Sequence, residues 1–225
     1  NNHVVRDAEQ ITASFTDGRE YPAKVIGTDP NTDIALLKIE ATNLPFLALD
    51  NSDNLEIGEW VMAVGSPLRL QGSVTVGVVS AKGRSELDIA PIEQFIQTDA
   101  AINMGNSGGC LLDMDCKVVG MNTAIATNNG GYMGIGFAIP SNILKHVMDQ
   151  LRDNGHVTRG YLGVSLQKID AKLASAFNLD KSEGALVAEV LKDSPADRAG
   201  LKSGDVVLKI NGKLVENVGS LRSTI

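Results

Sequence analysis

The sequence predicts a mainly β protein followed by a smaller unit that mixes strands and helices. From about Val4 to Val119, short β-branched runs alternate with turn residues, which is typical of a β-barrel or sandwich. Of all residues, 43% are apolar but only 4% are aromatic, and 23 are glycine, as expected for an aliphatic core with many turns. The pattern changes at Pro140, where a helical period begins.

Length and charge narrow the possible classes of protein. The 225 residues correspond to about one and a half domains of ~150 residues each. The net charge of −7 argues against nucleic acid as the main partner. No run approaches the ~18 apolar residues of a membrane span, and the composition excludes a disordered chain or a coiled coil. Because the chain opens at Asn1-Asn2-His3, we expect it to be an excerpt of a longer protein.

The first unit is expected to span residues 1–157. Its strands are predicted at residues 11–15, 34–39, 60–64 and 74–79, with a hairpin over 110–120. An amphipathic helix closes the unit: Ser141 is the predicted N-cap and Gly155 the left-handed stop. Its apolar face comprises Ile143, Leu144, Val147, Met148 and Leu151.

The second unit is expected to span residues 158–225 and to be truncated at its C-terminal end. It reads as a strand over 161–166, a helix near 171–177 and a strand over 185–190. Ser194-Pro195 begins a short helix that Gly200 ends. A strand over 205–210 then meets Asn211-Gly212, a hairpin turn, and another helix is expected to open within 220–225.

The two cysteines do not form a disulfide framework or a recognisable zinc site. Cys110 and Cys116 fall in the predicted hairpin, where a cross-strand disulfide is geometrically possible. Reduced, half-buried thiols are the preferred interpretation. No metal or organic cofactor is implied.

The Gly-rich segment around Ser107 has two interpretations. In one, it is a turn in which the serine satisfies a backbone group. In the other, it is a nucleophile loop: the amides of Gly105 and Ser107 converge to stabilise an oxyanion, while Gly108 and Gly109 leave room for an extended peptide.

A serine nucleophile needs a base, and the chain offers three histidines. His146 lies on the predicted closing helix and His156 just beyond it, so both are expected to be solvated. His3, judged by position alone, reads as a frayed terminal residue. Asp33, at the entrance to a buried-looking strand, is either a turn residue or a buried carboxylate that could orient an imidazole.

Several segments in the same order resemble the HtrA/Deg serine proteases. The resemblance covers essentially the whole chain, and Asn1-Asn2-His3-Val4-Val5 is similar to that family's histidine motif, which makes His3 the candidate base. The order His3, Asp33, Ser107 is also that of chymotrypsin-type proteases. The remaining matching segments are 32–36, 95–103, 105–109, 122–125 and 134–140.

The resemblance implies a chymotrypsin-like double β-barrel followed by a PDZ domain. It makes Ser107 the nucleophile, His3 the general base and Asp33 its orienter, with an oxyanion hole formed by Gly105 and Ser107 and helped by Asn106. It also implies cleavage of unfolded polypeptides by homotrimers or larger assemblies in the bacterial periplasm or envelope. A chaperone that holds unfolded chains with little proteolysis is the alternative.

Some positions depart from the family's pattern. Met104, Cys110 and Cys116 replace residues that are commonly proline, basic, alanine or glycine there, and this affects packing rather than the triad. In the family, further barrel strands normally precede His3, and we expect them to exist in the longer protein although this sequence does not include them. We also expect the loop over 104–106 to be a switch, because rotation of one peptide bond would dismantle the oxyanion hole.

Two binding surfaces are expected beside the triad. Residues 122–125, including Thr123 and Ala124, would pair with an extended substrate, and Ile102, Ile125 and Ile135 would line a narrow aliphatic primary pocket. In the second unit, the loop that follows Gly160 resembles a PDZ carboxylate-binding loop that captures peptide C-termini; its residues are Tyr161, Leu162, Gly163 and Val164.

Overall fold

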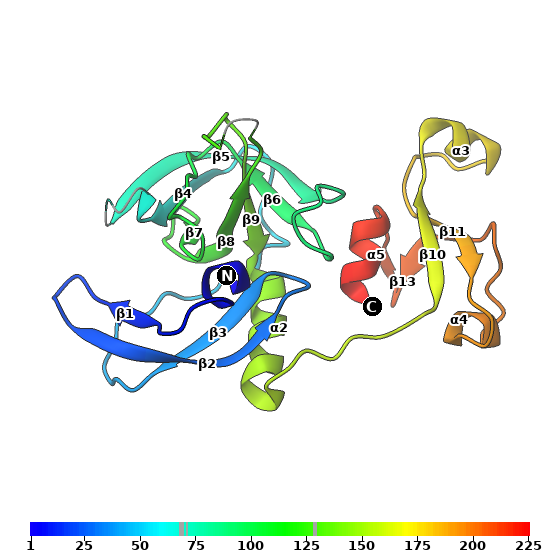
Figure 1. Cartoon of the computed structure of the whole chain (residues 1–225). Helices are drawn as coiled ribbons and strands as arrows, with labels where there is room; N and C mark the ends of the chain where they lie inside the picture. Colours follow the sequence, from blue (N-terminus) through cyan, green and yellow to red (C-terminus); the bar gives the residue numbers. More distant parts are fainter. Residues whose placement is uncertain (68–69, 71, 128–129) are drawn as a thin grey trace. The chain divides into compact units, whose positions relative to one another are not determined.

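The first half of the chain folds into a small sheet and a closed barrel. The computed structural model describes residues 1–67, 70, 72–127 and 130–225. The sheet has the antiparallel order β1-β2-β3 and comprises β1 (Thr12–Ser14), β2 (Glu20–Asp29) and β3 (Ile34–Ile39). The barrel has the order β4-β5-β6-β9-β8-β7 (Figure 1) and comprises β4 (Trp60–Gly65), β5 (Ser73–Arg84), β6 (Phe95–Thr98), β7 (Cys110–Leu112), β8 (Val118–Ile125) and β9 (Gly136–Pro140). The mainly β prediction is confirmed.

Helix α2 (Ser141–Asn154) connects the sheet and the barrel through a shared core. Val147 and Leu151 on its predicted apolar face are buried, and they pack with residues of β3, β6 and β9. Gly155 ends the helix with a φ of 75°, as predicted. The N-cap prediction is wrong: Pro140 occupies that position, and the Ser141 hydroxyl instead donates a hydrogen bond to the Asp50 carbonyl, 2.6 Å away.

Two local predictions in the first unit need correction. By position alone His3 was expected to be a frayed terminal residue, but it lies in α1 (Asn2–Val5), one helical turn that backbone contacts to the β2–β3 turn hold in place. Cys110 is half-buried as expected, whereas Cys116 is exposed in the β7–β8 turn with a φ of 59°. Both thiols are free.

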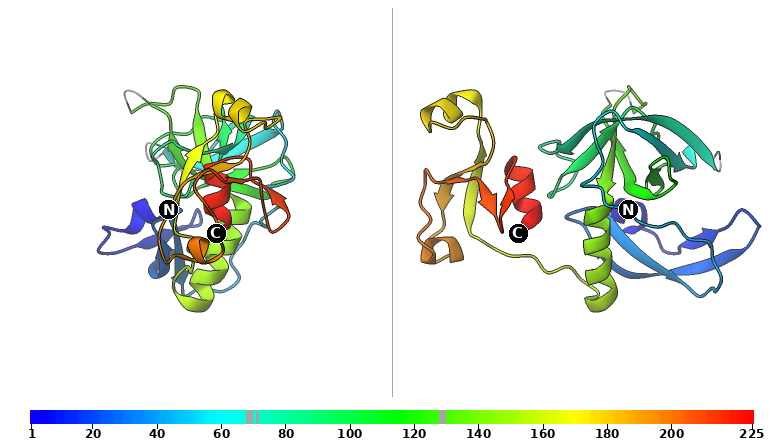
Figure 2. Two further views of the ribbon diagram at one scale, coloured as in Figure 1. Left: turned by 90° about the vertical axis from the view of Figure 1, so that its right-hand side faces the viewer. Right: turned by 180° about the vertical axis from the view of Figure 1, so that it is seen from behind.

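The second compact unit is Thr158–Ile225, and the first is Asn1–Val157. The second unit has a sheet of order β10-β11-β12 and a separate hairpin of β13 and β14. Figure 2 shows the ribbon of this unit, coloured from yellow to red, in two further views. Its elements are β10 (Val164–Lys168), α3 (Ala171–Ala176), β11 (Ala185–Val190), α4 (Pro195–Arg198), β12 (Val206–Val207), β13 (Lys209–Ile210), β14 (Lys213–Leu214) and α5 (Val218–Thr224).

Turn and cap signals in this unit are confirmed, while strand boundaries shift. The Ser194 hydroxyl caps α4, and Asn211-Gly212 forms the β13–β14 turn with φ angles of 50° and 80°. The first strand begins at Val164 rather than Tyr161, and the strand predicted over 205–210 is divided into β12 and β13. No helix within the described residues combines the length and apolar character needed to cross a membrane.

Candidate active site

Asp33 lies in the turn between β2 and β3, in a conformation held by its neighbours. Its φ of 60° is left-handed, which aspartate tolerates better than most residues. Its carbonyl accepts hydrogen bonds from the Asn2 amide at 3.0 Å and from Asn1 Nδ2 at 3.2 Å. Because only 9% of the residue is exposed, its carboxylate is fixed in direction.

His3 on α1 contacts both oxygens of this carboxylate. Its backbone amide donates to Asp33 Oδ1 at 2.8 Å, and its ring Nδ1 lies 2.6 Å from Oδ2. Since an ionised carboxylate only accepts, Nδ1 carries the proton, and Nε2 is left with a lone pair. The imidazole is 41% exposed, so substrate and solvent can reach Nε2.

Thr123, which the sequence predicted only as a substrate-binding residue, is a further hydrogen-bond partner of the Asp33 carboxylate. Its hydroxyl donates to Asp33 Oδ2 at 2.9 Å from the end of β8. The residue is 6% exposed, so water does not compete for this bond. A polar pair, Asn122-Thr123, in a largely apolar strand was the available signal, but the partner of Thr123 lies 90 residues away.

Ser107 joins the same network through Thr123. Its hydroxyl donates to the Thr123 carbonyl at 3.2 Å, and within the described part of the chain no hydrogen bond links it to His3. The structure therefore brings Asp33 and His3 together directly, and Ser107 indirectly. Rotation about the Ser107 Cα–Cβ bond is the movement that would redirect the hydroxyl, as is common in unliganded sites.

The loop before Ser107 presents two unused backbone donors. The Asn106 amide bonds to the Asn103 carbonyl at 3.0 Å, and Gly105 sits third in this turn with a φ of 102°, as a type II turn requires. The Gly105 carbonyl accepts from the Ser66 amide at 3.2 Å. Among the described residues, the Gly105 and Ser107 amides have no acceptor, so both remain available to an oxyanion.

The Asn106 side chain braces this loop from within. Only 2% of the residue is exposed, and its Nδ2 lies 3.4 Å from the Ala101 carbonyl. The side-chain amide of Asn106 is thus directed toward the Ala101 carbonyl. The role expected for Asn106 in the oxyanion hole would need a donor that faces the substrate.

The predicted aliphatic pocket residues fall into two groups. Ile102 is 2% exposed and lies in the barrel core, and Ile125 packs against the same cluster. A Cβ built on Gly136 would lie 2.8 Å from Ile102 Cδ1, so space there is narrow. Ile135, which directly precedes β9, packs instead in the cluster around Phe137.

The end of β8 has an open edge beside Ser107. β7 pairs with β8 only up to Met121, and the Asn122 backbone bonds to Gly108 and Gly109. Ala124 and Ile125 pair with β9 on the other edge. Within the described residues, the outer edge from Thr123 to Ile125 carries no strand, which suits addition of an extended peptide.

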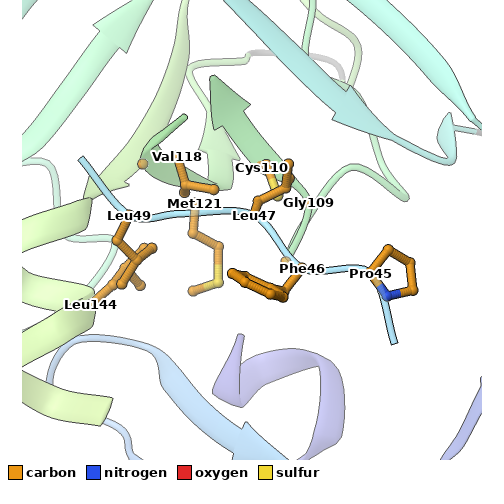
Figure 3. Close-up of a pocket in the computed structure, with 11 residues that line it drawn as sticks. Pro45, Phe46, Leu47, Leu49, Gly109, Cys110, Val118, Met121 and Leu144 are labelled. Carbon is orange, nitrogen blue, oxygen red and sulfur yellow. The ribbon is translucent and has the colours of Figure 1, made fainter. Parts of the chain in front are cut away.

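A separate apolar pocket of about 530 Å³ lies behind the Gly108-Gly109 backbone (Figure 3). Phe46, Met121 and Leu144 point into it. Cys110 also lines it, and burial raises the pKa of this thiol. None of the three predicted specificity isoleucines contributes to this pocket.

The second unit presents the loop expected to bind carboxylates. Gly163 has a φ of 78°, and a Cβ there would lie 2.3 Å from Ser194 Cβ, so only glycine fits. The carbonyls of Leu162 and Gly163 accept hydrogen bonds, but the amides of Tyr161, Leu162 and Gly163 have no acceptor among the described residues. β10, which follows from Val164, is an edge strand.

No group of three or more metal-ligating side chains occurs in the part of the chain that the structure describes. The groups that the described site brings together are a carboxylate–imidazole pair, a nearby hydroxyl and two backbone amides without an acceptor among the described residues.

Family comparisons agree with this geometry. The model of the trypsin-like peptidase domain matches residues 1–121, and the PDZ domain model matches residues 150–224. A protein of Chlamydia muridarum (strain MoPn / Nigg), named probable periplasmic serine endoprotease DegP-like, is 57% identical over all of this chain and 45% of its own length. A protein of the same name from Marinomonas sp. (strain MWYL1) is 52% identical over 98% of this chain and 47% of its own length.

The chain thus spans about half the length of these curated relatives. Among solved structures, the HtrA-type protease AlgW with tripeptide matches with a TM-score of 0.86 and 43% identity, over 100% of this chain and 75% of that one. The same protease with decapeptide matches with a TM-score of 0.81, over 69% of its chain. The chain belongs to the trypsin-like peptidase family, as an HtrA-type member that carries a PDZ domain.

Proposed function

We propose that this chain is the catalytic part, with one PDZ domain, of a periplasmic serine endopeptidase that degrades unfolded polypeptides without ATP. The observation that carries the proposal is the 2.6 Å contact between His3 Nδ1 and Asp33 Oδ2, beside two free amides at Gly105 and Ser107. The relatives named periplasmic DegP-like endoproteases support the same activity and location.

In the proposed mechanism, Ser107 is the nucleophile and His3 the base. As Oγ attacks the peptide carbonyl carbon, its proton moves to His3 Nε2, and Asp33 stabilises the resulting imidazolium. The carbonyl oxygen becomes an oxyanion that accepts hydrogen bonds from the Gly105 and Ser107 amides.

His3 then acts as the acid. It gives its proton to the leaving amine as the C–N bond breaks, which leaves an acyl ester on Ser107. A water molecule attacks this ester with His3 again as base. The bond between Oγ and the acyl carbon then breaks, His3 returns the proton to Ser107 Oγ, and the acyl part leaves as a carboxylic acid. Each half of the cycle uses the same two oxyanion donors.

Substrate selection is expected to depend on backbone and on small aliphatic side chains. The open edge of β8 would form hydrogen bonds with an extended peptide backbone, and unfolded chains present such backbone at many positions. The confined space at Ile102 and Ile125 favours Val, Ala or Ile before the scissile bond. Mapping cleavage sites by mass spectrometry tests this, and mostly Lys, Arg or Phe at that position would contradict it.

The PDZ unit is expected to capture peptide C-termini. A terminal carboxylate would accept from the free amides of Tyr161, Leu162 and Gly163 while the peptide extends β10. A peptide with a free C-terminus should therefore bind more tightly than its amidated form in calorimetry. Equal affinities would exclude carboxylate capture.

Degradation of casein and suppression of aggregation, measured side by side, test the activity against the chaperone alternative. Replacement of Ser107 by Ala should lower kcat by about 10⁶-fold while leaving peptide binding intact. Aggregation suppression without any serine-dependent cleavage by the wild type would support the chaperone instead.

A further inference from the structure

We propose that Asn1 is a positioning residue for the triad, which acts by fixing the direction of the Thr123 hydroxyl proton. The inference deepens the proposed function and rests on it. Asn1 Nδ2 donates to two acceptors, the Asp33 carbonyl at 3.2 Å and Thr123 Oγ1 at 3.2 Å. Both bonds are buried.

The orientation of the Asn1 amide follows from chemistry. A backbone carbonyl only accepts hydrogen bonds, so the atom of Asn1 facing the Asp33 carbonyl is the nitrogen. That same NH₂ group has a second proton, which it directs at Thr123 Oγ1.

A threonine hydroxyl has one proton, and the Asn1 contact decides where it goes. Because Oγ1 accepts from Asn1, its own proton is free for Asp33 Oδ2, 2.9 Å away. Asp33 then holds three donors on its carboxylate: the His3 amide, His3 Nδ1 and Thr123 Oγ1. Without Asn1, the hydroxyl is free to turn away, and the carboxylate and the imidazole lose one constraint.

Packing stability alone does not account for this asparagine. Asn1 is 91% buried, since 9% of it is exposed, yet its Oδ1 has no hydrogen-bond partner among the described residues. An unsatisfied buried oxygen opposes folding. What the side chain provides is the pair of donor contacts to Asp33 and Thr123.

The test uses the full-length protease with a peptide substrate, four test variants and two control variants. Asn1→Ala should lower kcat about tenfold with KM within about twofold, because the triad is loosened while the substrate edge is kept. Thr123→Val, which removes the hydroxyl at similar shape, should cause a comparable loss. The kcat of the double variant should be no lower than that of Thr123→Val alone, because both substitutions remove the same hydrogen-bonded connection from Asn1 through Thr123 to Asp33.

Asn1→Asp keeps the side-chain shape but, when ionised, has no donor, so it should also lower kcat. Asn142→Ala is the matched control. Asn142 lies on α2, outside the triad, and its side-chain amide donates to Asn51 Oδ1 at 2.6 Å. Loss of this amide should leave kcat unchanged. Wild-type turnover and its loss in Ser107→Ala are measured in parallel, so failure of the proposed function is seen separately.

Three results would overturn the role of Asn1 while the wild type stays active. One is a kcat within twofold of the wild type for Asn1→Ala and Asn1→Asp. Another is a loss in the double variant equal to the product of the single losses. The last is failure of both Asn1 variants to fold, which would make the residue structural.

Discussion

The protonation of the His3 imidazole depends on the two carboxylate oxygens of Asp33. This carboxylate accepts only, and this fixes the proton of His3 on Nδ1. Asp33→Asn would place an amide there that can donate to Nδ1 and favour the other tautomer. We predict that kcat falls about 10⁴-fold while the fold is kept, measured by steady-state kinetics and circular dichroism.

An Asp33→Asn variant that retained more than a tenth of wild-type kcat would show that His3 does not need this carboxylate. Asp50→Asn is the control, because Asp50 is a surface aspartate whose carboxylate pairs with Lys117 at 3.3 Å. It should keep full activity.

The two cysteines differ in reactivity for a physical reason. Burial raises the pKa of Cys110, so less of it is thiolate at neutral pH, whereas Cys116 is exposed. Iodoacetamide at pH 7 should therefore modify Cys116 first. As the pH is raised past the pKa of an ordinary thiol, the rate of modification of Cys110 should continue to rise. Peptide mass spectrometry over time measures this, and equal rates at pH 7 would contradict it.

Among the structural elements, the turn before Ser107 has the strictest geometry. Gly105 has a φ of 102°, and a Cβ there would lie 2.4 Å from the Ser66 carbonyl oxygen. Gly105→Ala should therefore rotate the peptide that presents the oxyanion amide and lower kcat by about 10²–10³. Gly18→Ala, at an exposed turn with a φ of 87° and open space around it, controls for backbone strain alone.

If Gly105→Ala turned over substrate as fast as Gly18→Ala, the Gly105 amide would not be an oxyanion donor. Such a result would also remove the basis for a switch at residues 104–106.

The loop between β5 and β6 is held by one buried carboxylate. Glu93, 5% exposed, accepts from the amides of Leu87 at 2.7 Å, Ile89 at 2.6 Å and Ala90 at 3.1 Å. Glu93→Gln replaces one acceptor by a donor facing these amides. The free energy of unfolding should fall by about 2 kcal/mol, measured by urea denaturation, whereas exposed Glu9→Gln should change it by less than about 0.5 kcal/mol.

Elements with local signals were predictable from the sequence, and elements held by distant contacts were not. The Ser194 cap, the Gly155 stop and the Asn211-Gly212 turn all follow from their own residues. The helical turn of α1 depends on contacts with Asp33, 30 or more positions away. Thr123 and Asn1 were missed as partners of Asp33 for the same reason, because nothing in the sequence pairs them.

For the whole molecule, the change of pattern at Pro140 and the segment 158–160 predicted two units, and the chain has two compact units, Asn1–Val157 and Thr158–Ile225. Each unit has its own hydrophobic core, in which α2 completes the first and α5 packs in the second. The residues proposed for the triad all lie within Asn1–Val157, and the amides proposed to capture peptides lie within Thr158–Ile225. We therefore expect cleavage and peptide capture to be separable by mutation.

Reaction with a fluorophosphonate, followed by intact-mass and peptide mapping, tests the central claim most directly. One adduct per chain should form on Ser107, and His3→Ala should slow its formation by at least about 10³-fold, because the hydroxyl then has no base. Modification elsewhere, or an equal rate without His3, would contradict the assignment of the catalytic serine and its base.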